Sequence, residues 1–172
     1  MRAEDDEYTA ECSRLIFAGG VHRALKPGCK FDSMVVLVGG QGCGKSTIVR
    51  LLNVHEDWYK EVTTIDGKEG IEALSGSWVA EFSEMMAMTS IKEIEGVKAY
   101  ITRQVDHVRK AYGRYESDLK RRCIFVGTTN NDRFLTDKTG NRRFFPVVVH
   151  SDGYDIGARE DEIREYICQC WA

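Results

Sequence analysis

A glycine-rich segment, GGQGCGKST at residues 39–47, constrains the fold of this chain more than any other stretch. It follows an apolar run at residues 34–38 and precedes apolar residues at helical spacing. A strand, a glycine-rich turn and a helix in this order are the parts of a phosphate-binding loop. The alternative is a chance glycine turn, but these residue types at these offsets arise in roughly one in a hundred sequences or fewer. The segment therefore predicts binding of a nucleoside triphosphate.

Each residue type in this segment has a task in phosphate binding. We expect Gly39, Gly42 and Gly44 to adopt positive φ and to turn backbone N–H groups towards phosphate oxygens, with the positive end of the following helix behind them. Lys45 is expected to reach the β- and γ-phosphates, and Ser46 to place its hydroxyl on Mg²⁺, with Thr47 as the less favoured hydroxyl. The predicted ligands are ATP and Mg²⁺, held by Gly39, Gly40, Gln41, Gly42, Cys43, Gly44, Lys45, Ser46 and Thr47.

The length and composition of the chain indicate one globular domain. A chain of 172 residues is long enough for one hydrophobic core, and 42% hydrophobic with 30% charged residues is typical of globular proteins. No apolar segment has the length of a membrane span, and the acidic start MRAEDDEYTAE lacks the apolar core of a signal peptide. We therefore expect a cytoplasmic protein that does not act at a membrane.

Positive charge is concentrated at residues 98–122. The formal net charge of the chain is −3, but this section holds eight Lys or Arg residues against three acidic residues. A local excess of positive charge favours contact with a polyanion. This section is therefore the candidate for nucleic-acid binding.

Periodic apolar residues predict alternating strands and helices. We expect strands at residues 34–38, 77–84, 123–126 and 144–149, and helices at 9–25, from the glycine-rich segment to about 52, and at 68–74, 91–110 and 159–171. This alternation is typical of a three-layer α/β/α protein with a largely parallel central sheet, which binds ligands at the carboxyl ends of its strands. The predicted P-loop NTPase fold is a single domain with a helical lead-in at 1–33, an ATPase core at 34–150 and a C-terminal helix at 151–172.

Hydrolysis of ATP needs an acid for the metal and the attacking water, and the expected strand at 77–84 offers two. Glu84 lies where this strand should end, whereas Glu81 lies three residues earlier and points to the opposite face. We favour Glu84, because a carboxylate inside a central strand would have to be buried, which costs free energy. Glu81 stays the second candidate, and for both the alternative role is pairing with a neighbouring Arg or Lys.

Two further groups are candidates for contact with the γ-phosphate. Asn130 follows the strand expected at 123–126, and its amide can bond both water and phosphate, although an Asn-Asn turn is the alternative. Arg142 and Arg143 form a cationic pair before the last strand, and Arg spreads charge over a transferring phosphoryl group, often from a neighbouring subunit. A solvated pair, or one bridged to Asp137, is the alternative.

Four segments, in chain order, carry a family resemblance: GGQGCGKST, GSWVAEFSEM, KAYITRQVDHVRKAYGR and RRCIFVGTTNNDRFLTDKTGNRRFFPV. Over residues 21–149 the chain resembles the virulence-associated protein E family. That family is similar to the superfamily 3 helicases and D5-like primase-helicases of phages and mobile elements, which have an AAA+-type core. The resemblance also implies a primase-like region upstream in the parent protein, and a ring oligomer, expected as a hexamer, in which a neighbour supplies an arginine. It implies a Walker A motif at 39–46, a Walker B-like acid at Glu84 or Glu81, a sensor at Asn130 and an arginine finger at Arg142 or Arg143.

In helicases of this class the loop or hairpin before the sensor strand faces the pore of the ring. Here AYGRYESDLKRR takes that place, within the basic section. We expect Tyr112 or Tyr115 to be available for base stacking. Single-stranded or forked DNA is expected to contact Lys110, Arg114, Lys120 and Arg121 through its phosphates.

The sequence thus predicts an ATP-hydrolysing DNA helicase or translocase domain of a phage or mobile-element replication protein. Two alternatives stay open. A P-loop small-molecule kinase would need an acceptor pocket and a lid, in which GTTN and GNRRFFP have no evident place. A nucleotide-binding interaction module without efficient hydrolysis is the other, because the acidic strand lacks the adjacent acid pair common in helicase ATPases.

Overall fold

The computed structural model describes residues 1–62, 64–65, 70–71, 74–83, 91–109, 116–130, 141–151, 153 and 155–172. The helices and strands, in chain order, are β1 (Arg2–Ala3), α1 (Glu7–Leu25), β2 (Met34–Val38), α2 (Lys45–Leu52), η1 (Glu56–Trp58), β3 (Tyr59–Glu61), β4 (Val79–Phe82), α4 (Ile91–Thr102), β5 (Val105–Arg109), β6 (Glu116–Lys120), β7 (Ile124–Thr129), η3 (Asn141–Arg143), β8 (Phe144–His150), η4 (Gly157–Arg159) and α5 (Glu160–Trp171).

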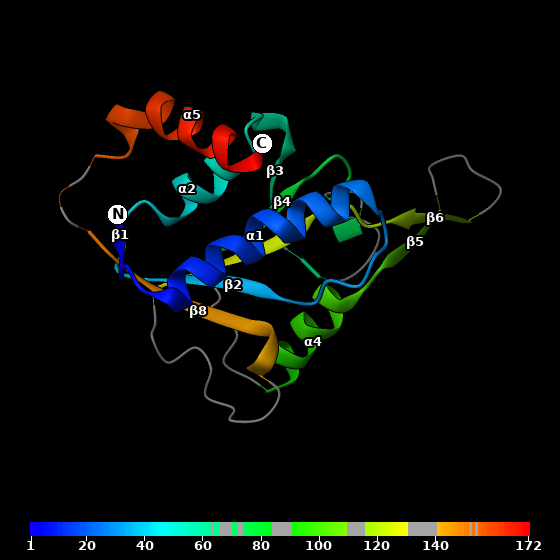
Figure 1. The fold of residues 1–172 in the computed structure, drawn as a ribbon. Helices are drawn as coiled ribbons and strands as arrows, with labels where there is room; N and C mark the ends of the chain where they lie inside the picture. The colour runs from blue at the N-terminus through cyan, green and yellow to red at the C-terminus, as the bar shows by residue number, and fades with distance from the viewer. Residues whose placement is uncertain are drawn as a thin grey trace.

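A six-stranded sheet in the order β1-β8-β2-β7-β4-β3 forms the centre of the molecule (Figure 1). Neighbouring strands are parallel, except that β1 is antiparallel to β8. Strand β7 lies between β2 and β4, so that Val38 pairs with Thr129. The carboxyl ends of β2, β7 and β4 therefore meet at one edge, where a parallel sheet binds its ligand. The predicted α/β fold with a largely parallel sheet is confirmed.

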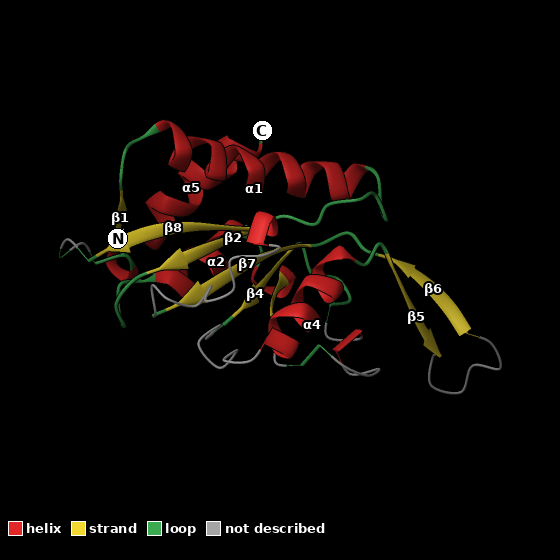
Figure 2. Cartoon of the chain, turned by 90° about the horizontal axis from the view of Figure 1, so that it is seen from below, coloured by secondary structure: helices red, strands yellow, loops and turns green. Residues whose placement is uncertain are grey.

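Different helices cover the two faces of the sheet, which gives three layers (Figure 2). Val35 and Leu37 pack into a hydrophobic cluster with residues of α1, α2 and α5. Met34, Val36 and Val38 pack into a second cluster with residues of α4. Because alternate side chains of a strand point to opposite faces, a strand covered on both sides needs the continuous apolar run that β2 has.

An antiparallel hairpin of β5 and β6 projects from the body of the molecule (Figure 1, Figure 2). The helix predicted at 91–110 is therefore wrong beyond α4, which ends at Thr102. Val105 and Val108 have a spacing that fits one more helical turn, but this part of the chain pairs with β6. A buried ion pair at the base of the hairpin, between Asp106 and Arg121, holds it in the extended form.

Strand β7 is longer than the strand predicted at 123–126. The sequence Gly-Thr-Thr was expected to form a polar turn, yet it continues the strand to Thr129. The polar side chain of Thr128 is buried there because its hydroxyl donates a hydrogen bond to Glu81. The helix predicted at 68–74 lies mostly outside the described residues, and β1, β3 and the hairpin were not predicted as strands. Among the described residues, no helix combines the length and apolarity that crossing a bilayer requires.

Candidate functional site

A cavity of about 640 Å³ lies at the carboxyl edge of the sheet, beside the loop of residues 39–44, which we call the glycine loop. This loop joins the end of β2 to the start of α2. The ends of β3, β4 and β7 form the rest of the wall. The lining residues are Gln41, Gly42, Gly44, Lys45, Ser46, Thr47, Glu61, Ser83, Thr128, Thr129 and Asn130.

Glycine is required in the loop for two different reasons. Gly42 and Gly44 have φ of 76° and 87°, in the left-handed region that side chains disfavour. Gly39 does not have positive φ, which corrects our expectation for it. It is instead packed so closely against the carbonyl oxygen of Val149 that a Cβ atom would collide with that oxygen. The loop is thus shaped partly by its own turn and partly by β8.

The Lys45 ammonium group lies inside the loop, in a side chain that is only 8% exposed. Its Nζ donates to the carbonyl oxygens of Gly39 at 2.7 Å and Gly40 at 2.8 Å, and to Oδ1 of Asn130 at 2.8 Å. The structure thereby brings the predicted loop lysine together with the predicted sensor across 85 residues of sequence. Cys43 is buried, with Sγ 3.7 Å from Nζ, and is not part of the cavity wall.

Glu81 is fully buried in β4, and three hydroxyl groups converge on its carboxylate. Oε1 accepts hydrogen bonds from Ser46 Oγ at 2.7 Å and Thr128 Oγ1 at 2.6 Å, and Oε2 accepts one from the Tyr59 hydroxyl at 2.5 Å. We disfavoured Glu81 because it would be buried, and this reasoning was wrong, since these donors replace the water that burial removes. Glu84 lies outside the described residues.

Three residues near the cavity were missed by sequence reasoning. Thr128 and Tyr59 hold Glu81 by hydrogen bonds, and burial together with the bond to that carboxylate raises the pKa of Tyr59. Glu61 lies opposite Glu81 in the register of the parallel strands β3 and β4, and it lines the cavity. The position of Thr128, two residues before Asn130, was the one local signal; Tyr59 and Glu61 depend on how β3 pairs with β4.

The donor set at the cavity fits a hard divalent cation. Ser46 Oγ lines the cavity at the N-terminus of α2, and a second potential ligand oxygen, Glu81 Oε1, lies 2.7 Å from it, buried behind the wall. Mg²⁺ prefers oxygen ligands, and commonly takes one or two carboxylates together with substrate phosphates. The glycine loop adds backbone N–H groups and the positive end of α2, which favour a phosphate. The arrangement can therefore hold a metal-bound phosphate chain.

Arg142 and Arg143 are not at this cavity. They form η3, directly before β8, whose first residue Phe144 pairs with Met34 at the start of β2. They therefore lie at the amino edge of the sheet, opposite to the glycine loop. Arg142 is exposed, and Nε of Arg143 lies 3.4 Å from a carboxylate oxygen of Asp32. The other partner considered for them, Asp137, lies outside the described residues.

The predicted nucleic-acid contacts divide into three groups. Lys110, Arg114 and both candidate tyrosines lie outside the described residues. Lys120 is exposed at the end of β6, as a phosphate contact requires. Arg121 is 4% exposed, its guanidinium bonds Asp106 and the carbonyl of Tyr100, and it lies 4.3 Å over the Tyr100 ring. The prediction that Arg121 contacts DNA is therefore wrong, because its donors are used inside the protein.

Solved structures of the NrS-1 C-terminal region are similar to this fold. An apo structure of that region has a TM-score of 0.62 and 14% identity, over 94% of this chain and 40% of that chain. Two A-form apo structures give TM-scores of 0.62 and 0.59 at 15% and 17% identity, over 94% and 99% of this chain and 39% and 45% of theirs. At such identity the likeness shows the fold alone, and the chain spans less than half the length of these structures.

Sequence comparisons give one family. No curated protein matches the chain. The family model of the virulence-associated protein E-like domain matches residues 1–172, which include the glycine loop, Glu81 and Asn130. The resemblance carried by the four segments is thus confirmed. The chain belongs to the virulence-associated protein E-like domain family.

Proposed function

We propose that this chain is a P-loop ATPase domain of helicase or translocase type, which hydrolyses ATP and acts on DNA during replication of a phage or mobile element. The observation that carries the proposal is the convergence of Lys45, Ser46 and Asn130 on one cavity at the carboxyl edge of the sheet, with the buried Glu81 bonded to Ser46 behind its wall. Membership of the virulence-associated protein E-like family supports the replication context.

Phosphate binding would use the protons that Lys45 now donates to carbonyl groups. The carbonyl oxygens of Gly39 and Gly40 are neutral acceptors, whereas a β- or γ-phosphate oxygen is charged and forms the stronger hydrogen bond. Lys45 would exchange these acceptors for the phosphate. Asn130, held against Nζ by its Oδ1, can direct its amide N–H to the γ-phosphate. Binding of the triphosphate is thereby coupled to the end of β7.

Ser46 and Glu81 would hold Mg²⁺, which supplies positive charge to the β- and γ-phosphate oxygens when it is bound. The remaining task is to orient the attacking water. Because Glu81 would be a ligand of the metal, we assign the orientation of the attacking water to Glu84, two residues after β4. Glu61, a carboxylate in the cavity wall, is the alternative. The adjacent acid pair of other helicase ATPases is here replaced by carboxylates at separate positions.

We propose a ring oligomer, and the positions of the arginines support it. Arg142 and Arg143 lie at the edge of the sheet opposite to the cavity, so within one chain they do not reach a bound γ-phosphate. A neighbouring copy would have to present one of them, as in a ring with the nucleotide between subunits. A hexamer around single-stranded or forked DNA, with a primase-like region upstream in the parent protein, is the assembly that we propose.

The experiment is steady-state hydrolysis of ATP with Mg²⁺, with and without single-stranded DNA. We expect turnover that rises with DNA and is lost in Lys45→Ala, while Lys26→Ala, which removes an exposed lysine at the end of α1, keeps the wild-type rate. Tight binding of ATP without turnover under any DNA condition would favour the nucleotide-binding module instead. We keep this alternative because hydrolysis in helicase ATPases commonly uses two adjacent acids. Among the described residues, Glu81 is the one acid that directly contacts the Walker A serine, Ser46.

A further inference from the structure

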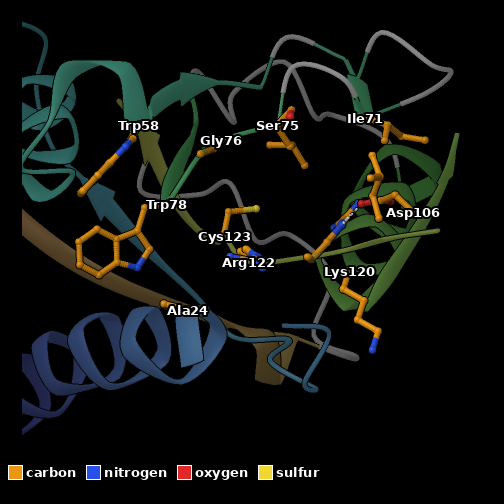
Figure 3. A pocket seen from close by; sticks show the side chains of 14 residues that line it. Ala24, Trp58, Ile71, Ser75, Gly76, Trp78, Asp106, Lys120, Arg122 and Cys123 are labelled. Atoms are coloured by element: carbon orange, nitrogen blue, oxygen red, sulfur yellow. Dashed lines mark hydrogen bonds and ion pairs between the residues drawn. The ribbon is translucent and has the colours of Figure 1, made fainter. Parts of the chain in front are cut away.

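A second cavity, of about 580 Å³, lies at the amino edge of the sheet (Figure 3). Its wall includes Ser77 and Trp78, which precede β4, and Arg122 and Cys123, which precede β7. The glycine loop follows the carboxyl end of β2. Strand β7 lies parallel to both β2 and β4, so the three strands run in the same direction. The two cavities therefore open at opposite edges, and no residue lines both.

The wall of this cavity is aromatic on one side and charged on the other. In Figure 3 the indole rings of Trp58 and Trp78 lie on one side, and Asp106 and Lys120 lie across from them. Trp78 is fixed by stacking on Trp171 at 4.2 Å, whereas Trp58 is 41% exposed. An exposed indole beside an apolar cavity offers a surface on which a planar ring can stack.

Ser77 gives an independent sign of a ligand. Its side chain is 6% exposed, and its Oγ has no hydrogen-bond partner among the described residues. Buried hydroxyl groups in native proteins are almost always paired, because an unpaired one loses its bond to water without replacement. This hydroxyl is also closed to solvent, so a ligand would have to displace part of the cavity wall to bond it, and would then remove this cost.

The charge of the wall favours an anion. Lys120 and Arg122 are exposed and make no ion pair with a described residue. The single carboxylate in the wall, Asp106, is already paired with Arg121, so it does not cancel these two charges. The chain as a whole has a net charge of −3, so this edge of the cavity is more positive than the chain average.

We propose that this cavity binds a nucleotide, with the base against Trp58, the phosphate at Lys120 and Arg122, and a polar edge of the base at Ser77. The cavity volume is in the range of small-ligand sites, and stacking on an aromatic ring beside cations is the common mode of single-strand binding. The nucleotide comes either as a free molecule or as a unit of single-stranded nucleic acid. The site is separate from the ATPase cavity; the free-nucleotide source goes beyond the proposed function, whereas the nucleic-acid source rests on the DNA contact proposed above.

The test uses the full chain carrying Lys45→Ala, in EDTA, so that neither the loop lysine nor Mg²⁺ supports binding at the glycine loop. Deoxythymidine 5′-monophosphate and a ten-residue oligo(dT) are titrated by calorimetry. We expect binding of one or both, weakened about tenfold by Trp58→Leu or Arg122→Ser. Matched controls are Tyr166→Leu on α5 and Arg2→Ser on β1, both exposed and outside the cavity, which should leave the affinity unchanged.

If only the monophosphate binds, the ligand is a free nucleotide. If only the oligonucleotide binds, the ligand is single-stranded nucleic acid. If neither binds, or if the controls weaken binding as much as the cavity variants, the proposal is wrong. Ser77→Ala adds a readout that a structural role would not give: binding weakens about threefold to tenfold, while thermal stability without ligand stays equal or rises because the unpaired hydroxyl is gone. Unchanged affinity in Ser77→Ala would remove Ser77 from the site.

Discussion

Replacing Glu81 by Gln and by Ala separates its structural role from its chemical role. The Gln side chain has nearly the same size as Glu, and its carbonyl oxygen can accept from Ser46 and Thr128 as Oε1 does. Its amide nitrogen can donate to the Tyr59 hydroxyl, which is an acceptor as well as a donor. The three hydrogen bonds therefore persist in Glu81→Gln and are all lost in Glu81→Ala.

The expected loss of stability differs between the two variants. A hydrogen bond to a charged group contributes about 1 kcal/mol more than a neutral one, so Gln loses ~3 kcal/mol over three bonds. Part of this is offset because a buried amide costs less to desolvate than a buried carboxylate, which leaves a net loss of about 1–2 kcal/mol. Glu81→Ala leaves Thr128 buried without a partner and opens a cavity, at a cost of about 3–5 kcal/mol.

The assay combines thermal unfolding with ATP binding and hydrolysis. A loss of 1 kcal/mol lowers the midpoint by about 2–4 °C in a domain of this size, so Gln should unfold a few degrees below wild type and Ala ~10 °C or more below it. Glu81→Gln should bind ATP without Mg²⁺ as wild type does and hydrolyse it at least ~100-fold more slowly, since the metal loses its carboxylate. Wild-type turnover in Glu81→Gln, or equal destabilisation by Gln and Ala, would refute the reasoning.

Three further predictions follow from single contacts. Tyr59→Phe removes the donor to Oε2 of Glu81, so half-maximal hydrolysis should need several-fold more Mg²⁺; an unchanged Mg²⁺ profile would show that Tyr59 does not position the carboxylate. Arg121→Met leaves Asp106 buried without its partner and should lower the free energy of unfolding in urea by about 3–5 kcal/mol, whereas Arg121→Met with Asp106→Leu should recover most of it; equal losses in both variants would contradict a buried ion pair. Burial raises the pKa of the Cys123 thiol from 9.0 to about 11, so the stability that it contributes is full below pH 9 and is lost as the pH rises through about 11; Cys123→Ala should lose less stability than wild type over that interval in urea titrations, and parallel pH profiles would count against this.

The parts of the fold that the sequence predicted depend on local patterns. Strand β2 and the loop after it were found because five buried residues and a glycine-rich turn are contiguous. The helix expected to run to residue 110 failed because Val105 and Val108 fit a helix or a strand over so short a stretch. Pairing with β6 and the ion pair between Asp106 and Arg121 decide for a strand, and both partners lie beyond the stretch in which the apolar spacing was read.

The candidate site was predicted as to its location and only partly as to its chemistry. Lys45, Ser46 and Asn130, which were singled out by their types and by their positions after strands, line one cavity. Glu81 was ranked below Glu84 because the cost of burial was counted without the hydroxyl groups of Ser46, Tyr59 and Thr128, which come from three other segments. The cavity at the amino edge was not predicted for the same reason, because its wall combines segments that only the fold brings together.

The central claim is that the glycine loop holds a triphosphate with its metal. The most direct measurement is a crystal structure of the chain with Mg²⁺ and a non-hydrolysable ATP analogue. We predict that Lys45 Nζ leaves the carbonyl oxygens of Gly39 and Gly40 for the β- and γ-phosphates, with Asn130 at the γ-phosphate and Ser46 on the metal beside Glu81. A nucleotide bound away from the loop, or a Lys45 that keeps both carbonyl contacts in the complex, would contradict the account.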